Sequence, residues 1–153
     1  MTINFVKNDG GRAKAGYKGY TGDCVTRSIA IATGLGYEEV YRELSERQKV
    51  WATSSRRRAA KKQLKRGTSA RNGVHRPVYE AYLAELGWEW VPVMKIGTGC
   101  TMHVKASELP NYKRLILRLS SHLTAVVDGE LHDTYDCSRD GTRCVYGYFR
   151  KAK

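Results

Sequence analysis

The period of the hydrophobic pattern changes once along this chain, near Trp88. Before Trp88, apolar residues recur at the spacing of amphipathic helices over residues 24–33, from about Tyr37 onward and over residues 75–86. After Trp88 the apolar runs are short and typical of strands. We expect strands over residues 88–93, 101–104, 114–119, 123–127, 131–135 and 145–149. This order predicts an α+β fold, with N-terminal helices packed on a C-terminal antiparallel sheet.

The size and composition of the chain fit one domain. Its 153 residues are 41% hydrophobic, which is enough for one modest core, so we expect a single domain over residues 1–153. The chain has no run of 18 apolar residues, so we expect no transmembrane helix. Its N-terminal residues do not resemble a secretory signal. We therefore expect a cytoplasmic protein that does not bind membranes, with its four cysteines present as thiols.

The positive charge of the chain is concentrated in one segment. The chain carries 27 Lys and Arg against 15 Asp and Glu, yet no acidic residue lies between Arg47 and Tyr79. We expect a mobile basic insert at about residues 47–76, with a short helix over residues 55–65, because few large apolar side chains are available there. Contact with nucleic acid or an acidic protein is one interpretation, and a solvated loop is the other. The cations expected to make such contacts are Arg56, Arg57, Arg58, Lys61, Lys62, Lys65 and Arg66.

Cys24 is predicted to occupy the first position of a helix. Asp23 is a favourable N-cap residue and Gly34 a favourable helix end, while Val25 and Ile29 would face the core. The positive end of a helix dipole stabilises a thiolate, and the free backbone amides there can receive an oxyanion. The sequence therefore indicates a reactive thiol at Cys24, with a small buried first-turn residue as the alternative.

A predicted hairpin brings a histidine and an aspartate together. Asp128-Gly129, between two apolar runs, is a strong signal for a two-residue turn. Side chains alternate across a strand, so this register places His122 and Asp133 on one face as diagonal neighbours, about 7–8 Å apart between Cα atoms. His132 falls on the other face. A slip of one residue would reverse this choice. The register therefore selects His122 and Asp133 as an imidazole–carboxylate pair, with strand-end capping by His122 as the alternative.

Three segments carry a resemblance to a known family. They are Gly-Asp-Cys-Val-Thr-Arg-Ser-Ile-Ala-Ile-Ala at residues 22–32, Ser-His-Leu-Thr-Ala-Val-Val-Asp-Gly at residues 121–129, and His-Asp-Thr-Tyr-Asp at residues 132–136. Together they resemble the papain-like cysteine peptidase superfamily, in which the Cys opens the central helix and the His and Asn or Asp follow on the sheet. The chain also resembles small proteins of bacteriophages and prophages over nearly its whole length.

The resemblance implies a function and a role for each residue. Cys24 would be the nucleophile, His122 the base and Asp133 the group that orients it. These roles imply a phage-type thiol hydrolase, acting as a cysteine peptidase or an amide or isopeptide hydrolase, or else an acyl transferase, with a protein or peptide substrate. The family usually places a Gln about six positions before the Cys, where this chain has Lys18. The oxyanion would then depend on the Cys24 amide, helped by a loop amide or Lys18.

Two other functions compete with catalysis. One is a catalytically inactive binding module that uses the basic insert to contact nucleic acid or an acidic protein. The other is a zinc site, which Cys100, His103, Cys137 and Cys144 could supply. The six-residue gap between the last two cysteines is not a usual zinc spacing, and the first pair is Cys-x-x-His. We therefore expect no metal and no cofactor.

Overall fold

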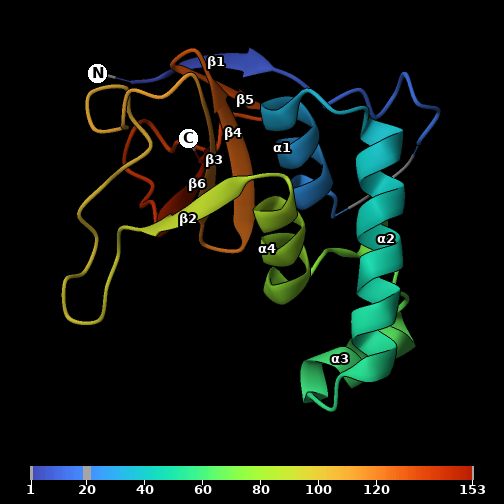
Figure 1. Ribbon diagram of the computed structural model, residues 1–153. Helices are drawn as coiled ribbons and strands as arrows, with labels where there is room; N and C mark the ends of the chain where they lie inside the picture. Colours follow the sequence, from blue (N-terminus) through green and yellow to red (C-terminus); the bar gives the residue numbers. More distant parts are fainter. Residues whose placement is uncertain (1, 19–21, 153) are drawn as a thin grey trace.

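The computed structural model of the chain describes residues 2–18 and 22–152 and has an α+β fold (Figure 1). The helices are α1 (Cys24–Thr33), α2 (Tyr37–Ser54), α3 (Arg58–Arg66) and α4 (Arg76–Glu85), with a 3₁₀ turn at Ala70–Asn72. The strands are β1 (Asn4–Lys7), β2 (Trp88–Pro92), β3 (Arg114–Leu119), β4 (His122–Val127), β5 (Glu130–Asp133) and β6 (Gly147–Lys151). The predicted sequence of helices followed by strands is confirmed, apart from β1.

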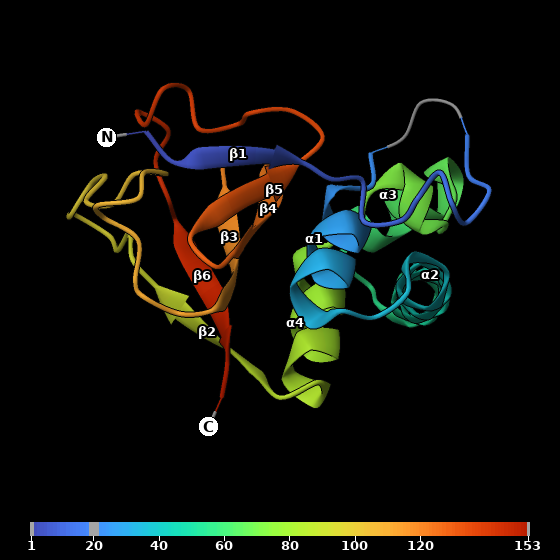
Figure 2. The ribbon, with the colours of Figure 1, turned by 90° about the horizontal axis from the view of Figure 1, so that it is seen from above.

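One six-stranded sheet, in the order β1-β5-β4-β3-β6-β2, separates two layers of the molecule. Figure 2 shows the helices on one side of this sheet and the segment between β2 and β3 on the other. Each face has its own apolar core. Leu123 and Ala125 belong to the core under the helices, while Val126 and Leu131 belong to the core on the opposite face. This split follows from the alternation of side chains along β4.

The sheet is mixed, which corrects the expectation of an antiparallel sheet. Strand β1 pairs in parallel with β5, and no strand was expected in the first residues of the chain. A four-residue strand at a sheet edge has too few residues to show a clear period. Its pairing depends on a partner more than a hundred residues away, so no local pattern predicts it.

The predicted hairpin between β4 and β5 has the expected register. Its turn residues Asp128 and Gly129 have φ values of 51° and 77°, as a type I′ turn requires. The paired residues are Val127 with Glu130, Val126 with Leu131, and Ala125 with His132. The ladder ends there, so Thr124 and Asp133, the next positions along the two strands, lie beyond it. The register is nevertheless the one that places His122 and Asp133 on the same face.

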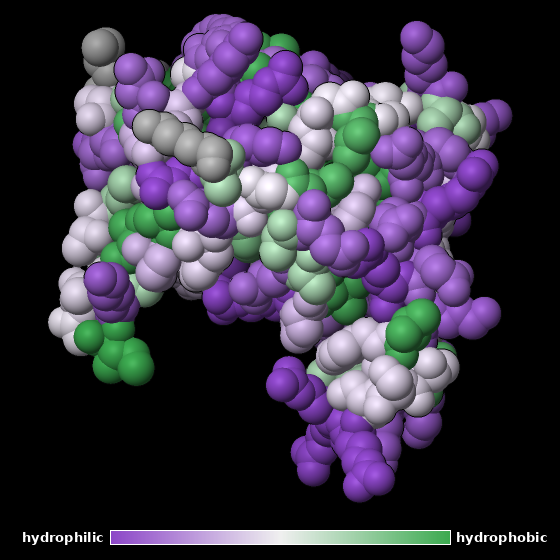
Figure 3. Space-filling view, viewed as in Figure 1, coloured by the Kyte–Doolittle hydropathy of each residue, from purple (hydrophilic) through white to green (hydrophobic). Residues whose placement is uncertain are grey.

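The basic segment is largely helical, whereas we expected a loop with one short helix. Helix α2 continues into the segment as far as Ser54, and α3 spans Arg58–Arg66, close to the helix expected over residues 55–65. Ala60 and Gln63 of α3 are buried, and the cations point outward. In the orientation of Figure 1, hydrophilic side chains form the lower edge of the projecting end of this segment, beside paler and some hydrophobic side chains (Figure 3). Small and amide side chains thus supply the contacts that large apolar residues usually make.

The segment between β2 and β3 differs from the expectation in two respects. Residues 101–104 form no strand; the segment instead makes an isolated bridge between His103 and Cys144, and Val104 is buried in the apolar core of that face. Cys100 and Cys144 form a disulfide with a Cα–Cα distance of 5.8 Å, so our expectation of four free thiols is wrong. The bridge brings the two chain segments within the distance that a disulfide requires. Cys24 and Cys137 are free.

None of the helices in the described part of the chain combines the length and the apolar character needed to cross a bilayer.

Candidate active site

Cys24 is the first residue of α1, as predicted, and its side chain is partly exposed. Asp23 occupies the N-cap position but makes no side-chain cap hydrogen bond, which corrects its expected role. Its carboxylate instead accepts hydrogen bonds from Arg27 and from the Tyr37 hydroxyl, the latter at 2.6 Å. The Asp23 carboxylate therefore does not block the amides in the first turn of α1, which stay available for a negatively charged oxygen beside the Cys24 sulfur.

His122 and Asp133 form a buried hydrogen-bonded pair. Nε2 of His122 lies 2.7 Å from Oδ2 of Asp133, and the residues are only 9% and 2% exposed. The same carboxylate accepts hydrogen bonds from the Thr124 hydroxyl and the Thr134 amide, each at 2.7 Å. These contacts fix the carboxylate, and the carboxylate fixes the plane of the imidazole. Because Nε2 is engaged with Asp133, Nδ1 is the ring nitrogen left for a reacting group.

The electrostatics of the three residues favour a thiolate–imidazolium pair. Burial opposes ionisation of Cys24, yet its pKa is lowered below the usual value of 9.0, chiefly because the side chain interacts with His122. Burial likewise opposes charging of His122, but hydrogen bonds to Asp133 and to two thiols raise its pKa to about 11. The pKa of Asp133 falls to about 2 against the effect of burial, because His122 and Thr124 donate to it. Cys24, His122 and Asp133 are thus brought together as predicted.

Arg27 joins the helix to the carboxylate of Asp133 and was missed in the sequence. One nitrogen of its guanidinium pairs with Asp23 and another lies 3.2 Å from Oδ1 of Asp133. Arg12 approaches Asp23 from a third segment, at 3.8 Å. Buried charges are stable only when they are paired, so this network fixes α1 relative to β5. The spacing of four between Asp23 and Arg27 could have indicated the first pair, but the contact with Asp133 is long-range.

A groove of about 420 Å³ opens over Cys24 and His122. The apolar part of its lining includes Val25, Val74, Leu119 and Leu123. The polar part comes from β3, from α4 with its N-cap residue and from the residue before β6; it includes His75, Arg76, Tyr79, Arg118 and Tyr146. None of the described residues that line this groove is acidic. The reactive pair therefore lies in an open, cationic groove rather than in a sealed interior.

Lys18 is not placed to assist an oxyanion. Its side chain is exposed, and Lys18 does not belong to the described lining of the groove. Its carbonyl oxygen accepts a hydrogen bond from Arg71, and the next three residues lie outside the described part of the chain. Among the candidates that the sequence offered, the Cys24 amide is the donor that lies beside the sulfur.

Cys137 lies near the pair, which the sequence did not indicate. It is 1% exposed and interacts with His122. Ligand atoms of His122, Asp133 and Cys137 lie within 4.8 Å of one another, a spacing that could hold a metal ion. Metal binding there would compete with the 2.7 Å hydrogen bond between His122 and Asp133. Cys137 is therefore separate from Cys100, His103 and Cys144, with which it was grouped in the predicted zinc set.

The seven cations predicted to bind an acidic partner are all exposed, and none contacts a carboxylate of the described residues. They are Arg56, Arg57, Arg58, Lys61, Lys62, Lys65 and Arg66. Helix α3 is also joined to the wall of the groove, because Oε1 of Gln63 lies 2.8 Å from Nε2 of His75. The basic helix and the groove over Cys24 are therefore connected by a partly buried polar contact.

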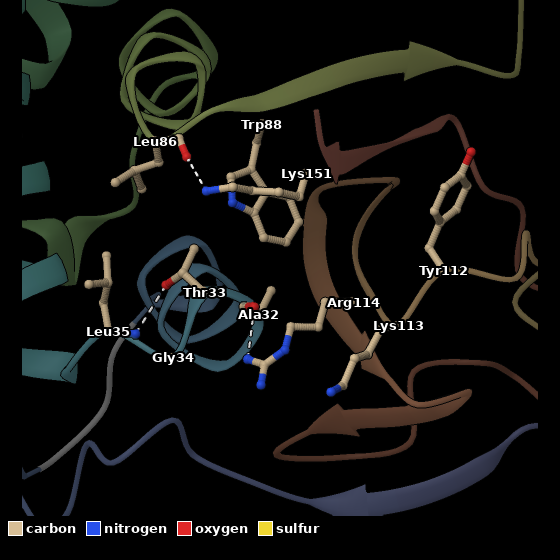
Figure 4. Close-up of a pocket in the computed structure, with 10 residues that line it drawn as sticks. All are labelled: Ala32, Thr33, Gly34, Leu35, Leu86, Trp88, Tyr112, Lys113, Arg114 and Lys151. Atoms are coloured by element: carbon tan, nitrogen blue, oxygen red, sulfur yellow. Dashed lines mark hydrogen bonds between the residues drawn. The ribbon is translucent and has the colours of Figure 1, made fainter. Parts of the chain in front are cut away.

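A larger cavity, of about 600 Å³, lies at the opposite end of α1 (Figure 4). Two of its cations are already bound to helix carbonyls: Lys151 donates to Leu86 at 2.7 Å, and Arg114 donates to Ala32 at 3.1 Å. Both contacts satisfy carbonyl groups at or near helix C-termini, a structural role for cations. The cavity contains neither a thiol nor an imidazole, so we assign the chemistry to the smaller groove.

Comparisons of this chain with protein-family models, with curated proteins and with solved structures find no match.

Proposed function

We propose that this protein is a papain-like thiol hydrolase that cleaves an amide or isopeptide bond. The observation that supports it is the arrangement of three groups: a thiol at a helix N-terminus, an imidazole that interacts with it, and a buried carboxylate 2.7 Å from the far side of that imidazole. A nucleophile, a base and an orienting group in this relationship are the parts that acyl-transfer catalysis requires. Transfer of the acyl group to another amine is the same chemistry with a different acceptor.

The reaction follows from the positions of these groups. The Cys24 thiolate attacks the carbonyl carbon, and the carbonyl electron pair moves to oxygen, where the Cys24 amide donates a hydrogen bond. Nδ1 of His122 gives its proton to the leaving nitrogen, the carbon–nitrogen bond breaks and a thioester remains. Water then attacks the thioester while His122 takes its proton, which releases a carboxylate and restores the thiolate. Asp133 holds the ring and stabilises its positive charge throughout.

The charge of the groove favours an acidic substrate. Arg118 lies in the groove wall at 5.9 Å from the Tyr146 ring, and it pairs with no carboxylate of the described residues. The neighbouring Arg76 is paired with Glu80, outside the groove lining. A guanidinium in the same groove as the thiol, without a carboxylate partner among the described residues, attracts an acidic side chain of the substrate. The exposed cations of α3 would hold a longer acidic chain by the same attraction.

Alkylation of the thiols tests the proposal. We expect iodoacetamide near neutral pH to modify Cys24 first and as a single adduct, read by intact mass and confirmed with Cys24→Ala. The buried Cys137 should react slowly because it is 1% exposed. His122→Ala should slow the reaction, whereas His132→Ala should not, because His132 contacts Asn8 at 3.1 Å. Equal rates for wild type and His122→Ala would contradict the proposal. So would loss of Cys24 reactivity on adding a chelator, because the reactivity would then depend on a bound metal rather than on His122.

Cleavage itself is measured with a quenched peptide library rich in Asp and Glu. We expect turnover by the wild-type protein and none by Cys24→Ala. Rapid Cys24 labelling without cleavage of any acidic or neutral peptide would favour acyl transfer, which a labelled amine acceptor would reveal. Absence of both activities would leave the thiol reactive but reject the proposed function.

A second candidate function, as a nucleic-acid-binding module, is favoured by the exposure of all seven cations of the basic segment. Exposed Lys and Arg without acidic neighbours bind phosphates through release of counterions, so the affinity falls steeply with salt. Binding of a fluorescent oligonucleotide, measured as a function of salt concentration, tests this function independently of Cys24. If Cys24→Ala and His122→Ala bind as well as the wild-type protein, the two functions are separate.

A further inference from the structure

The segment between β2 and β3 is held against the sheet by a junction around His103, next to which Val104 is buried in the apolar core of that face. It runs from residue 93 to residue 113 without a helix or strand. Connections of more than about 12–15 residues without secondary structure are uncommon in compact domains. Two hydrogen bonds flank the bridge between His103 and Cys144: the Val104 amide donates to Arg143 at 2.9 Å, and the Val145 amide donates to Met102 at 2.8 Å. The Cys100–Cys144 disulfide closes this junction.

His103 has a fixed orientation beside the disulfide. Its Nε2 lies 3.6 Å from the Cys100 sulfur, and its Nδ1 lies 3.1 Å from Oε1 of Glu108. The same carboxylate oxygen accepts the His103 amide at 3.1 Å, and Lys105 holds the other oxygen at 2.9 Å. A carboxylate on one ring nitrogen, which leaves the other nitrogen directed at a ligand position, is the usual surrounding of a zinc-binding histidine.

The distances agree with the geometry of zinc. Zn–S bonds of about 2.3 Å and Zn–N bonds of about 2.0–2.1 Å at a tetrahedral angle put a sulfur and a nitrogen ligand about 3.6 Å apart. The Cys100 sulfur and Nε2 of His103 have this separation in the disulfide form. After reduction only the Cys144 sulfur needs to withdraw, by rotation of a single side chain. Cys100 is exposed, so a fourth ligand can come from solvent.

We propose that reduction of this disulfide creates a zinc site formed by the sulfurs of Cys100 and Cys144 and by Nε2 of His103, with water as the fourth ligand. A small dithiol supplies two electrons and two protons, the sulfur–sulfur bond breaks, and the dithiol becomes a disulfide. Zn²⁺ then binds the two thiolates and displaces their two protons. The junction is held by a covalent bond in the oxidised chain and by the metal in the reduced chain.

The experiment uses the full chain in both redox states. The protein is reduced with a dithiol, freed of it by anaerobic gel filtration, and titrated with Zn²⁺ against a chromophoric chelator and with Co²⁺ by absorption. We expect one equivalent of metal in the reduced protein with thiolate-to-cobalt bands, and no binding in the oxidised protein. His103→Gln should weaken binding at least tenfold, and Glu108→Gln should weaken it about 10–100-fold. The double variant Cys24→Ser with Cys137→Ser should bind like the wild-type protein.

Several results would reject the site. Metal binding that is equal in oxidised and reduced protein would reject it, and so would no metal binding by the reduced wild type. Metal binding that neither His103→Gln nor Glu108→Gln weakens would also reject it. The fourth such result is loss of metal binding in the Cys24 and Cys137 double variant. That last result would move the metal to His122 and its neighbours. Circular dichroism of each variant separates loss of a ligand from loss of the fold. Because Glu108 is not itself a ligand, Glu108→Gln provides the test if His103→Gln does not fold.

Discussion

His122 and Asp133 lie on neighbouring antiparallel strands, with Nε2 of the imidazole 2.7 Å from Oδ2 of the carboxylate. The contact is diagonal across the hairpin and leaves Nδ1 of the ring for the thiol of Cys24. The register of the hairpin therefore sets the orientation of the His122 ring at the N-terminus of α1. The predictions below follow from this contact and from the charges around it.

The reactivity of Cys24 should depend on pH through its own lowered pKa. In the wild-type protein the thiolate persists below the usual pKa of 9.0, so the alkylation rate should decline only as the pH falls through that lowered value. In His122→Ala burial is opposed only by the Leu123 amide and by Arg27, so the pKa of Cys24 should rise and the decline should move to higher pH. At a pH below both pKa values the rate should differ about tenfold for each unit between them. Superimposable rate profiles of the two proteins would contradict this prediction.

The stability of the fold should reflect the raised pKa of His122. A protonated imidazole held by Asp133 stabilises the folded chain fully below the usual His pKa of 6.5, and this contribution is lost as the pH rises toward about 11. The free energy of unfolding of the wild-type protein should therefore decline over this range relative to that of His122→Ala. Urea denaturation at several pH values measures the difference. If the difference in unfolding free energy between the two proteins does not change with pH, His122 and Asp133 do not form a charged pair.

Asp133→Asn should impair catalysis while preserving shape. The amide cannot stabilise the imidazolium, so the pKa of His122 should fall and peptide cleavage should slow by about 100-fold or more. Separate measurement of kcat and KM tests this, because loss of an orienting group should lower kcat and leave KM nearly unchanged. Asp136→Asn is the matched control, because Asp136 accepts hydrogen bonds from Ser138 and does not contact His122. Equal loss in the two variants would indicate a general structural effect.

Arg27→Met should destabilise the fold far more than a surface arginine variant. The Arg27 side chain is 10% exposed and lies between two buried carboxylates, so its removal breaks two buried ion pairs and should cost about 3–5 kcal/mol. Arg42→Met is the control: Arg42 pairs with Glu38 at the same helical spacing but is 78% exposed, so it should cost no more than about 1 kcal/mol. Urea denaturation of the two variants should separate them clearly. Similar values would mean that the buried network contributes little.

Arg118→Leu should change the choice of substrate rather than the chemistry. Arg118 lines the groove but is not in the triad, so Cys24 labelling by iodoacetamide should stay near the wild-type rate. Cleavage of acidic peptides should fall about tenfold or more relative to neutral ones, because a charged hydrogen bond contributes about 1.5–3 kcal/mol. The ratio of kcat/KM for matched Glu and Gln peptides measures this. An unchanged ratio would place substrate selection elsewhere.

Replacing Arg56, Arg57 and Arg58 by alanine should weaken oligonucleotide binding and flatten its dependence on salt. Each lost phosphate contact should reduce the slope of log affinity against log salt by about 0.9 for duplex DNA. A control variant with Lys14, Lys95 and Lys113 replaced has the same loss of net charge from exposed positions away from α3. If both triple variants bind equally, net charge alone governs the binding and α3 is not the interface.

Much of the candidate site could be predicted from local patterns. The start of α1 at Cys24 follows from helical periodicity, and the relation of His122 to Asp133 follows from a two-residue turn whose sequence sets the register. Both depend on residues close together in the chain. Arg27, Cys137 and the altered role of Asp23 could not be predicted in this way. Their contacts join segments far apart, and several local conformations of each residue have similar energies.

The sequence by itself determined the helical and strand periods, the hairpin register and the position of the positive charge, because each depends on a few neighbouring residues. Only the tertiary structure decided that the N-terminus of α1 lies beside His122, that β1 pairs with β5, and that Cys100 meets Cys144 across a separation of 44 residues. These contacts exist because burial of both faces of one sheet compensates the entropy of closing long loops. The balance between burial and loop-closure entropy depends on the whole chain, so the sequence of a single segment does not predict these contacts.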